Sequence, residues 1–325
     1  MCTSIFQIAC DGTHVLSRTM DWPVLANQPA FIPRNYQWES DFDGQTHTNR
    51  YAMVGSAFQD GHRIDLSDGV NEWGLTAQKL TFANGAELAV SRRDDRVQLA
   101  PYEFVFWLLG QFRSVDEVID HLADVQLMAA TYSNRDYGRP ELHFAVADRT
   151  GKMVAIEPTT IPMRVVADPL GILTNVPNFE RELDRLGQYV TFTPDFLAGT
   201  VPLNTPKVTT GNLSGKAIPP GSYSPSSRFV RAAYFKERAD QPADEAAAIV
   251  SSWRLLDGVA VPKNTDHQQT YSVYRAAAVC ESRTLYFEPY HRGALVKLQL
   301  TTEMLSWTTP VFYPVADELT VMSLN

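Results

Sequence analysis

Blocks of strand-forming and helix-forming sequence alternate along this chain, and their order constrains the fold more than any other feature. The strand-forming blocks lie within residues 2–82, 142–175 and 269–300, and the helix-forming blocks lie within 101–125 and 179–256. Because each element must bury its apolar face against another layer, this order predicts an α+β fold of two sheets covered by helices. The 325 residues contain no evident linker and no internal repeat, so we expect a single domain over residues 1–325.

The N-terminal residues predict a β-hairpin. Two apolar, β-prone runs at 2–9 and 14–20 flank the dipeptide Asp11-Gly12. Asp-Gly between two such runs is a strong signal for a tight turn. A two-residue loop made of Asp11 and Gly12 would pair residues across the hairpin whose numbers add up to 23.

In that register Cys2 lies opposite Asp21, with both side chains on one face of the hairpin. A carboxylate at that place could hold and orient an α-ammonium group on Cys2. Arg18 would lie on the other face, because successive side chains of a strand alternate. It would reach Cys2 only if the strand bulges or ends early, which Trp22-Pro23 could cause.

Cys2 is the candidate nucleophile. It follows Met1, which is normally removed before a small residue, so we expect the mature chain to start at Cys2. One residue then carries a thiol with a pKa of about 8.5 and an α-amine with a pKa of about 7.7–8.0. Such an amine can take the proton of the thiol, which is a recognised pairing of nucleophile and base.

Composition and charge argue against several other kinds of protein. A net charge of -9 without a basic cluster disfavours nucleic-acid binding. Cys2, Cys10 and Cys280 are too few and too scattered for a disulfide framework. No apolar run approaches the ~20 residues of a membrane span, and no signal peptide fits before Cys2. We therefore expect a soluble, cytoplasmic protein.

The sequence predicts neither a metal nor an organic cofactor. The seven histidines show no i, i+4 pair and no metal-ligand spacing. Neither a glycine-rich phosphate loop nor a G-x-S-x-G elbow occurs, so nucleotide chemistry and serine-hydrolase chemistry have no support.

Several segments carry a resemblance to a known family. They read MCTS at 1–4 with SRTMDW at 17–22, DGVNEWGL at 68–75, GILTNVP at 171–177 and PSSRFVR at 225–231. With these motifs in this order, the chain resembles the choloylglycine hydrolase family, which includes bile salt hydrolases and penicillin V acylases. The resemblance runs over nearly the whole chain, from Cys2 to the C-terminal strands.

The resemblance implies a fold and a set of site residues. The fold is the four-layer αββα sandwich of N-terminal nucleophile hydrolases. The implied catalytic residues are Cys2, Arg18, Asp21, Asn175 and Arg228. Cys2 would attack an amide carbonyl with its own α-amine as the base, and Arg228 would help to organise the N-terminus.

The developing oxyanion needs hydrogen-bond donors, and the resemblance implies two of them. One is the side-chain amide of Asn175, and the other is the backbone N–H of Thr81. Family members carry Asn or Tyr at the position of Thr81. The backbone N–H is present whichever residue occupies position 81. A role of the Asn or Tyr side chain in substrate choice, however, cannot be transferred to Thr81.

The substrate stays open at the level of the sequence. The SRTMDW segment is closer to penicillin V acylases, which favours a cysteine amidohydrolase of that type acting on a small, linear N-acyl amide. The alternative is a conjugated bile salt hydrolase that releases glycine or taurine, and a remote alternative is a non-catalytic binding protein. Trp22, Phe58 and Asn71 are candidate substrate-binding residues, and the two aromatic rings favour an apolar acyl group.

Residues 188–221 predict an extended loop with a role in assembly. The stretch is rich in Pro, Gly, Thr and Ser, yet it also contains apolar side chains. Docking on a neighbouring subunit would bury these side chains and offset the entropy lost on ordering. Family resemblance implies a homotetramer built in this way, and the alternative is a loop that folds back on its own subunit.

Overall fold

The computed structural model describes residues 1–61, 63–133, 136–187, 221–264, 266 and 269–324. The segment 188–220, which makes up almost all of the predicted assembly loop, lies outside the described residues. Among the described residues, no helix is both long and apolar enough to cross a bilayer. Among the described residues there is also no group of three or more His, Cys, Asp or Glu side chains that could hold a metal ion.

The N-terminal hairpin lies at the centre of a six-stranded antiparallel sheet with the order β14-β1-β2-β15-β16-β17. Its strands are β1 (Cys2–Ile8), β2 (His14–Trp22), β14 (Ile172–Leu173), β15 (Tyr271–Val279), β16 (Thr284–Pro289) and β17 (Val296–Gln299). Strands from both ends of the sequence therefore form this sheet.

The second large sheet has eight antiparallel strands in the order β13-β12-β11-β8-β7-β6-β3-β18. They are β3 (Gln28–Ile32), β6 (Met53–Asp60), β7 (Arg63–Asn71), β8 (Thr76–Thr81), β11 (Leu142–Ala147), β12 (Met153–Glu157), β13 (Arg164–Ala167) and β18 (Val311–Phe312). Two small sheets pair β4 (Gln37–Glu39) with β5 (Thr46–Thr48), and β9 (Val97–Leu99) with β10 (Val125–Leu127).

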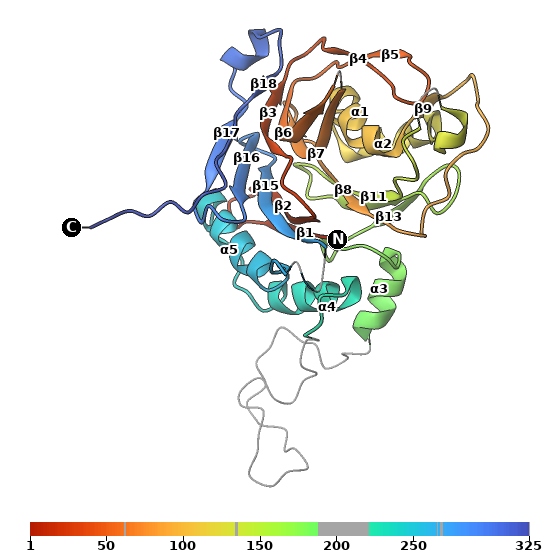
Figure 1. Ribbon diagram of the computed structural model, residues 1–325. Coiled ribbons are helices and arrows are strands. Elements are labelled where there is room, and N and C mark those ends of the chain that lie inside the picture. The colour runs from red at the N-terminus through yellow and green to blue at the C-terminus, as the bar shows by residue number, and fades with distance from the viewer. Residues whose placement is uncertain (62, 134–135, 188–220, 265, 267–268, 325) are drawn as a thin grey trace.

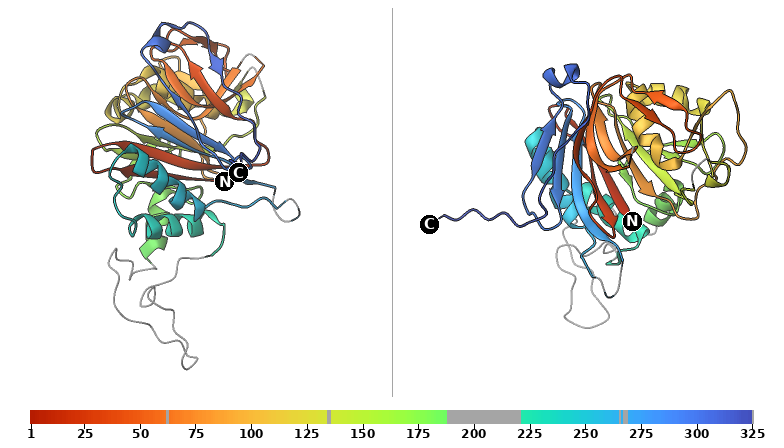
Figure 2. Two further views of the ribbon diagram at one scale, coloured as in Figure 1. Left: turned by 90° about the vertical axis from the view of Figure 1, so that its left-hand side faces the viewer. Right: turned by 45° about the horizontal axis from the view of Figure 1, so that its top comes forward.

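Helices cover the outer faces of both large sheets (Figure 1). The helices α1 (Phe104–Gln111) and α2 (Val115–Asp120) lie on the side of the eight-stranded sheet, where α1 contacts β7 and β8. The helices α3 (Phe179–Leu186), α4 (Pro225–Lys236) and α5 (Glu245–Asp257) lie on the side of the six-stranded sheet, where α4 and α5 contact β1. The result is the four-layer αββα sandwich, and Figure 2 shows the layers from two other sides.

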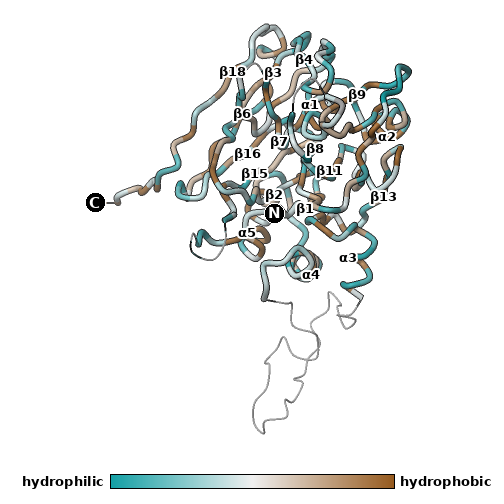
Figure 3. The backbone as a smooth tube through the Cα atoms, turned by 45° about the vertical axis from the view of Figure 1, so that its right-hand side comes forward, coloured by the Kyte–Doolittle hydropathy of each residue, from teal (hydrophilic) through white to brown (hydrophobic). Residues whose placement is uncertain are grey.

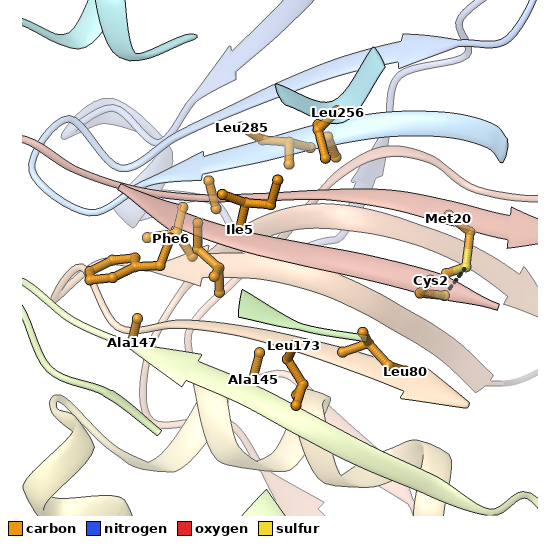
Figure 4. Packing of buried hydrophobic residues seen from close by; sticks show 14 of the residues in the cluster. Cys2, Ile5, Phe6, Met20, Leu80, Ala145, Ala147, Leu173, Leu256 and Leu285 are labelled. Carbon is orange, nitrogen blue, oxygen red and sulfur yellow. Dashed lines mark hydrogen bonds between the residues drawn. The ribbon is translucent and has the colours of Figure 1, made fainter. Parts of the chain in front are cut away.

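Alternating side chains of β1 join the layers. Figure 4 shows Phe6 on the side of Ala147, in the facing sheet, and Ile5 on the side of Leu256, in α5. This follows from the period of two along a strand, and β1 is buried on both faces from Cys2 to Gln7. In Figure 3 the hydrophilic segments lie mainly on the outside, in α3 and in the loops near β9.

The structure corrects one predicted boundary. The sequence predicts helix-forming residues up to 125, but α2 ends at Asp120, and a short turn leads into β10. Val125 and Leu127 lie in β10, which pairs in parallel with β9. A spacing of two places both side chains on one face of a strand, and β9 supplies the partner with which this strand pairs.

Candidate active site

The N-terminal hairpin forms as predicted, but in a different register. Cys2 pairs with Met20, and Ile8 pairs with His14, so paired numbers add up to 22 instead of 23. The loop has three residues with Gly12 at φ +88°, and Thr13 N–H bonds to the Asp11 carboxylate at 2.9 Å. Such three-residue loops, with glycine in the left-handed region, are a common hairpin connection. The prediction that Cys2 lies opposite Asp21 is therefore wrong.

This shift of one residue exchanges the two faces of β2 relative to β1. Arg18 is paired with Ser4 and shares a face with Cys2 and Met20, so it needs no bulge to lie near the thiol. Figure 4 shows Cys2 and Met20 side by side, with their sulfur atoms 3.8 Å apart.

Arg18 is completely buried between the sheets. Its guanidinium donates to Ser67 O at 3.1 Å and lies 3.6 Å from the Asp68 carboxylate. Burial by itself lowers the pKa of Arg18, while the nearby Cys2 and Tyr274 raise it, and the net shift is upward. The arrangement places a permanent cation beside the thiol.

Asn175 contacts Cys2 from the end of β14. Its Oδ1 accepts from Cys2 N at 2.8 Å and from Arg228 Nη2 at 2.7 Å. Its Nδ2 donates to Thr81 O at 2.7 Å, which determines the orientation of the amide. Asn175 therefore links the backbone of Cys2 to the end of β8.

Arg228 comes from the first turns of α4 and is also completely buried. It donates to Cys2 O at 2.5 Å, to the Thr3 hydroxyl, and to Tyr223 O at 3.0 Å. The helix begins with Ser224 as its N-cap and Pro225 in its first turn, which positions this arginine. Arg228 thus holds the backbone on the carbonyl side of Cys2.

Asp21 is buried on the opposite face of β2 from Met20. Ser272 donates to its Oδ1 at 2.6 Å, and its Oδ2 lies 4.0 Å from Arg228 Nη1. The backbone of Asp21 exchanges two hydrogen bonds of 2.9 Å with Met1. Among the described residues, Asp21 Oδ2 has no hydrogen-bond donor.

Thr81 is the last residue of β8, and its backbone reaches the same site. Phe82 N–H donates to Glu141 O in the direction of β11, so the N–H of Thr81 points to the other edge of β8. Pairing of that edge with β7 ends at Gln78, so the Thr81 N–H lies beyond the last paired residue. Asn175 Nδ2 binds Thr81 O at this edge, which places the two predicted oxyanion donors next to each other.

A cavity of about 230 Å³ opens beside Cys2. Cys2, Met20 and Thr81 line it together with Trp22, Ala26, Asn27, Phe58, Asp65, Ser67, Lys79, Tyr102, Pro140 and Leu142. Trp22 and Phe58 are thus brought to the cavity, as a substrate-binding role requires.

Asn71 does not line this cavity. It is completely buried, and its amide donates to Leu109 O and Phe112 O while accepting from the backbone of Trp73 and Leu75. These bonds hold the turn after β7 to the end of α1. The structure therefore places Asn71 at the end of β7, where it does not line the cavity with Cys2.

Two further residues, Asp68 and Tyr274, support the site but are not among its predicted residues. Asp68 accepts from Tyr274 and from Ser56, both at 2.6 Å, and supports Arg18 from the facing sheet. Asp68 is the first residue of the DGVNEWGL segment, so its position in this motif could have identified it as a site residue. Tyr274 has no such signal, because its contact with Asp68 joins residues 206 positions apart.

The four layers, with a cysteine at the start of a central strand, define the N-terminal nucleophile class of hydrolase folds. The family model of linear amide C–N hydrolases, choloylglycine hydrolase family, matches residues 2–313. The chain belongs to this family and is a hydrolase acting on linear amide C–N bonds. The predicted family and fold are both confirmed.

Relatives and solved structures cover the full chain. The bile salt hydrolase/transferases of Clostridium perfringens and Lactiplantibacillus plantarum are 25% and 29% identical to it, over 100% of both chains in each case. The penicillin V acylase of Pectobacterium atrosepticum is 24% identical, over 82% of this chain and 65% of its own. The fold matches a solved C2A variant of the C. perfringens conjugated bile acid hydrolase with a TM-score of 0.89, at 23% identity and full coverage of both chains.

Proposed function

We propose that the protein hydrolyses conjugated bile salts with Cys2 as its nucleophile, after removal of Met1. The observation that supports this most is the position of Cys2. Its N atom and its carbonyl are held by Asn175 and Arg228, and its side chain borders the cavity. The two contacts fix the backbone of Cys2, and its Sγ lies 3.8 Å from Met20 Sδ.

The roles of the residues follow from these contacts. Cys2 Sγ attacks the amide carbonyl, and the freed α-amine of Cys2 takes the thiol proton and passes it to the leaving amine. Asn175 Nδ2 and the Thr81 N–H donate to the oxyanion. Water then cleaves the acyl-thioester and restores the thiol.

The remaining charged groups position the nucleophile. Arg18 lies beside the thiol as a permanent cation. Removal of Met1 withdraws the carbonyl that Asp21 N–H binds now. The Asp21 carboxylate stays 4.0 Å from Arg228 Nη1, and among the described residues its Oδ2 has no hydrogen-bond donor. We propose that Asn175 Oδ1 and the Asp21 carboxylate accept from the freed α-amine of Cys2, while Arg228 holds Asn175 and the Cys2 carbonyl in place.

The choice of substrate rests on the relatives and on the cavity. The SRTMDW segment favours penicillin V as the substrate. Relatives named bile salt hydrolase/transferase, however, match over the full length, whereas the penicillin V acylase does not, and this favours bile salts. Met20, Trp22, Phe58 and Leu142 supply an apolar wall beside Cys2 for a large acyl group. Penicillin V remains the second candidate, because a penicillin V acylase is also among the relatives.

The experiment compares the wild type with Cys2→Ala on glycocholate, taurocholate and penicillin V at equal concentrations. We expect release of glycine and taurine at kcat/KM values well above that for penicillin V, and complete loss in Cys2→Ala. A folded Cys2→Ala enzyme with wild-type turnover would refute the mechanism, and a clear preference for penicillin V would refute the substrate.

The sequence and the family resemblance also bear on the domain organisation, the assembly and the location of the protein. We propose a single domain over residues 1–325, a homotetramer to which residues 188–221 contribute, and a cytoplasmic location. Light scattering at micromolar concentration tests the assembly, and a monomer would contradict it.

A further inference from the structure

An ion pair lines the cavity beside Cys2. Lys79 Nζ pairs with Asp65 Oδ1 and donates to Tyr102 O at 3.3 Å. The two charged residues are only 8% and 7% exposed, and both belong to the cavity wall. The same cavity therefore combines an apolar wall with two buried charges.

The pair lines the same cavity as Thr81 and Cys2. Lys79 precedes Thr81 by two residues in β8, so both side chains point to the same face of the strand, about 7 Å apart along it. Asp65 comes from β7, near the point where the pairing of β7 with β8 ends. An acyl group that fills this cavity from Thr81 would contact the pair.

The pair keeps a hydrogen-bond donor available. An ammonium group has three N–H donors, and among the described residues Lys79 has two acceptors, Asp65 and Tyr102. Asp65 is held in addition by Arg63, whose Nη1 lies 3.5 Å from Asp65 Oδ2. The remaining donor of Lys79 is buried at a wall of the cavity.

A structural role alone gives a weak reason for such a pair. Taking two charges out of water costs as much as their attraction returns, and apolar residues of similar volume are often at least as stabilising. None of the proposed catalytic steps uses Lys79 or Asp65.

We propose that Lys79 and Asp65 select acyl groups that carry a hydroxyl on an otherwise apolar body. The hydroxyl oxygen accepts from the third N–H of Lys79, and the apolar body contacts Met20, Phe58 and Leu142. An acyl group without the hydroxyl would displace water from the ammonium and leave its donor unpaired, which is penalised. This inference rests on the proposed hydrolysis of bile salt amides.

The test uses two substrates with the same carbon skeleton. Glycocholate carries ring hydroxyls, and the glycine amide of 5β-cholanic acid carries none; both are used below their aggregation concentrations. For the wild type we expect kcat/KM to be at least about 10-fold higher for glycocholate, the fold-change expected of one hydrogen bond to a charged group.

The variant that tests the pair is the double substitution Asp65→Leu with Lys79→Met. A single substitution would leave one buried charge without its partner, whereas the double one replaces the pair by apolar groups of similar size. We expect kcat/KM to fall for glycocholate and to rise for the cholanic amide, so that the preference is lost. The control is Asp116→Asn with Lys152→Met, an exposed pair at 2.6 Å outside this cavity, which should keep the preference.

The outcomes separate the two proposals. Equal wild-type rates on the two amides, with an inactive Cys2→Ala, would leave the proposed function intact and refute the role of the pair. A preference that survives in the double variant would refute that role as well. If the wild type cleaves neither amide, the proposed function fails, and this inference fails with it.

Discussion

At the scale of single residues, Asn175 connects the parts of the site. Its oxygen accepts from Cys2 N and from Arg228, and its nitrogen donates to Thr81 O. The amide nitrogen has two hydrogens, so one remains for a substrate oxygen. We therefore propose two roles for Asn175, one in holding the N-terminus and one in stabilising the oxyanion.

The substitution Asn175→Asp separates these roles. Aspartate keeps an oxygen for Cys2 N and Arg228 but has no N–H to donate, so we expect kcat to fall by about 10²–10³ while the protein stays folded. Glycine release from glycocholate measures the rate, and circular dichroism measures folding. The matched control Asn178→Asp makes the same chemical change at the N-cap of α3 and should leave kcat unchanged. An Asn175→Asp enzyme with kcat near the wild-type value would show that Asn175 donates nothing to the transition state.

At the scale of elements, His143 ties β11 to the segment that precedes Asn175. Its Nε2 bonds to Thr174 O at 2.8 Å, and its ring stacks on Phe82 with centroids 4.5 Å apart. A carbonyl accepts only, so Nε2 carries the proton. Burial lowers the pKa of His143 from 6.5 to about 4, although the bond to Thr174 opposes this shift.

This lowered pKa predicts the sign of a pH effect. The unfolded chain binds a proton at His143 below pH 6.5, and the folded protein does so only near pH 4. The stability due to the neutral ring is thus complete above pH 6.5 and is lost as the pH falls towards 4, by up to about 3 kcal/mol. We expect the difference in unfolding free energy between the wild type and His143→Gln to shrink between pH 7.5 and pH 4.5. Urea unfolding at both values measures it, with the exposed His121→Gln as the control. A difference that does not change with pH would mean that His143 is not buried in its neutral form.

The register of the hairpin shows where prediction from the sequence ends at this scale. Asp11-Gly12 correctly predicts the hairpin, because few other sequences favour such a turn. It does not distinguish a two-residue from a three-residue loop, since glycine serves both. One residue of difference moves Arg18 from the far face to the face of Cys2.

At the scale of the whole molecule, the two sheets bring distant residues into one site. Cys2, Thr81, Asn175 and Arg228 come from β1, β8, the end of β14 and α4. The layered fold follows from the order of helices and strands, but no periodicity relates these four positions. Their grouping could be predicted only through family motifs. Residues outside those motifs, such as Lys79 and Tyr274, became visible only in the packed structure.

The central claim is that Cys2 acts as the first residue of the mature chain, with its own α-amine as the base. Rapid acid quench during turnover of glycocholate, followed by peptide mass spectrometry, tests it most directly. The account predicts that the active enzyme lacks Met1 and that the acyl group is bound to the N-terminal peptide at Cys2. Active enzyme that retains Met1, or an acyl group found on Cys10 or Cys280 instead, would contradict it.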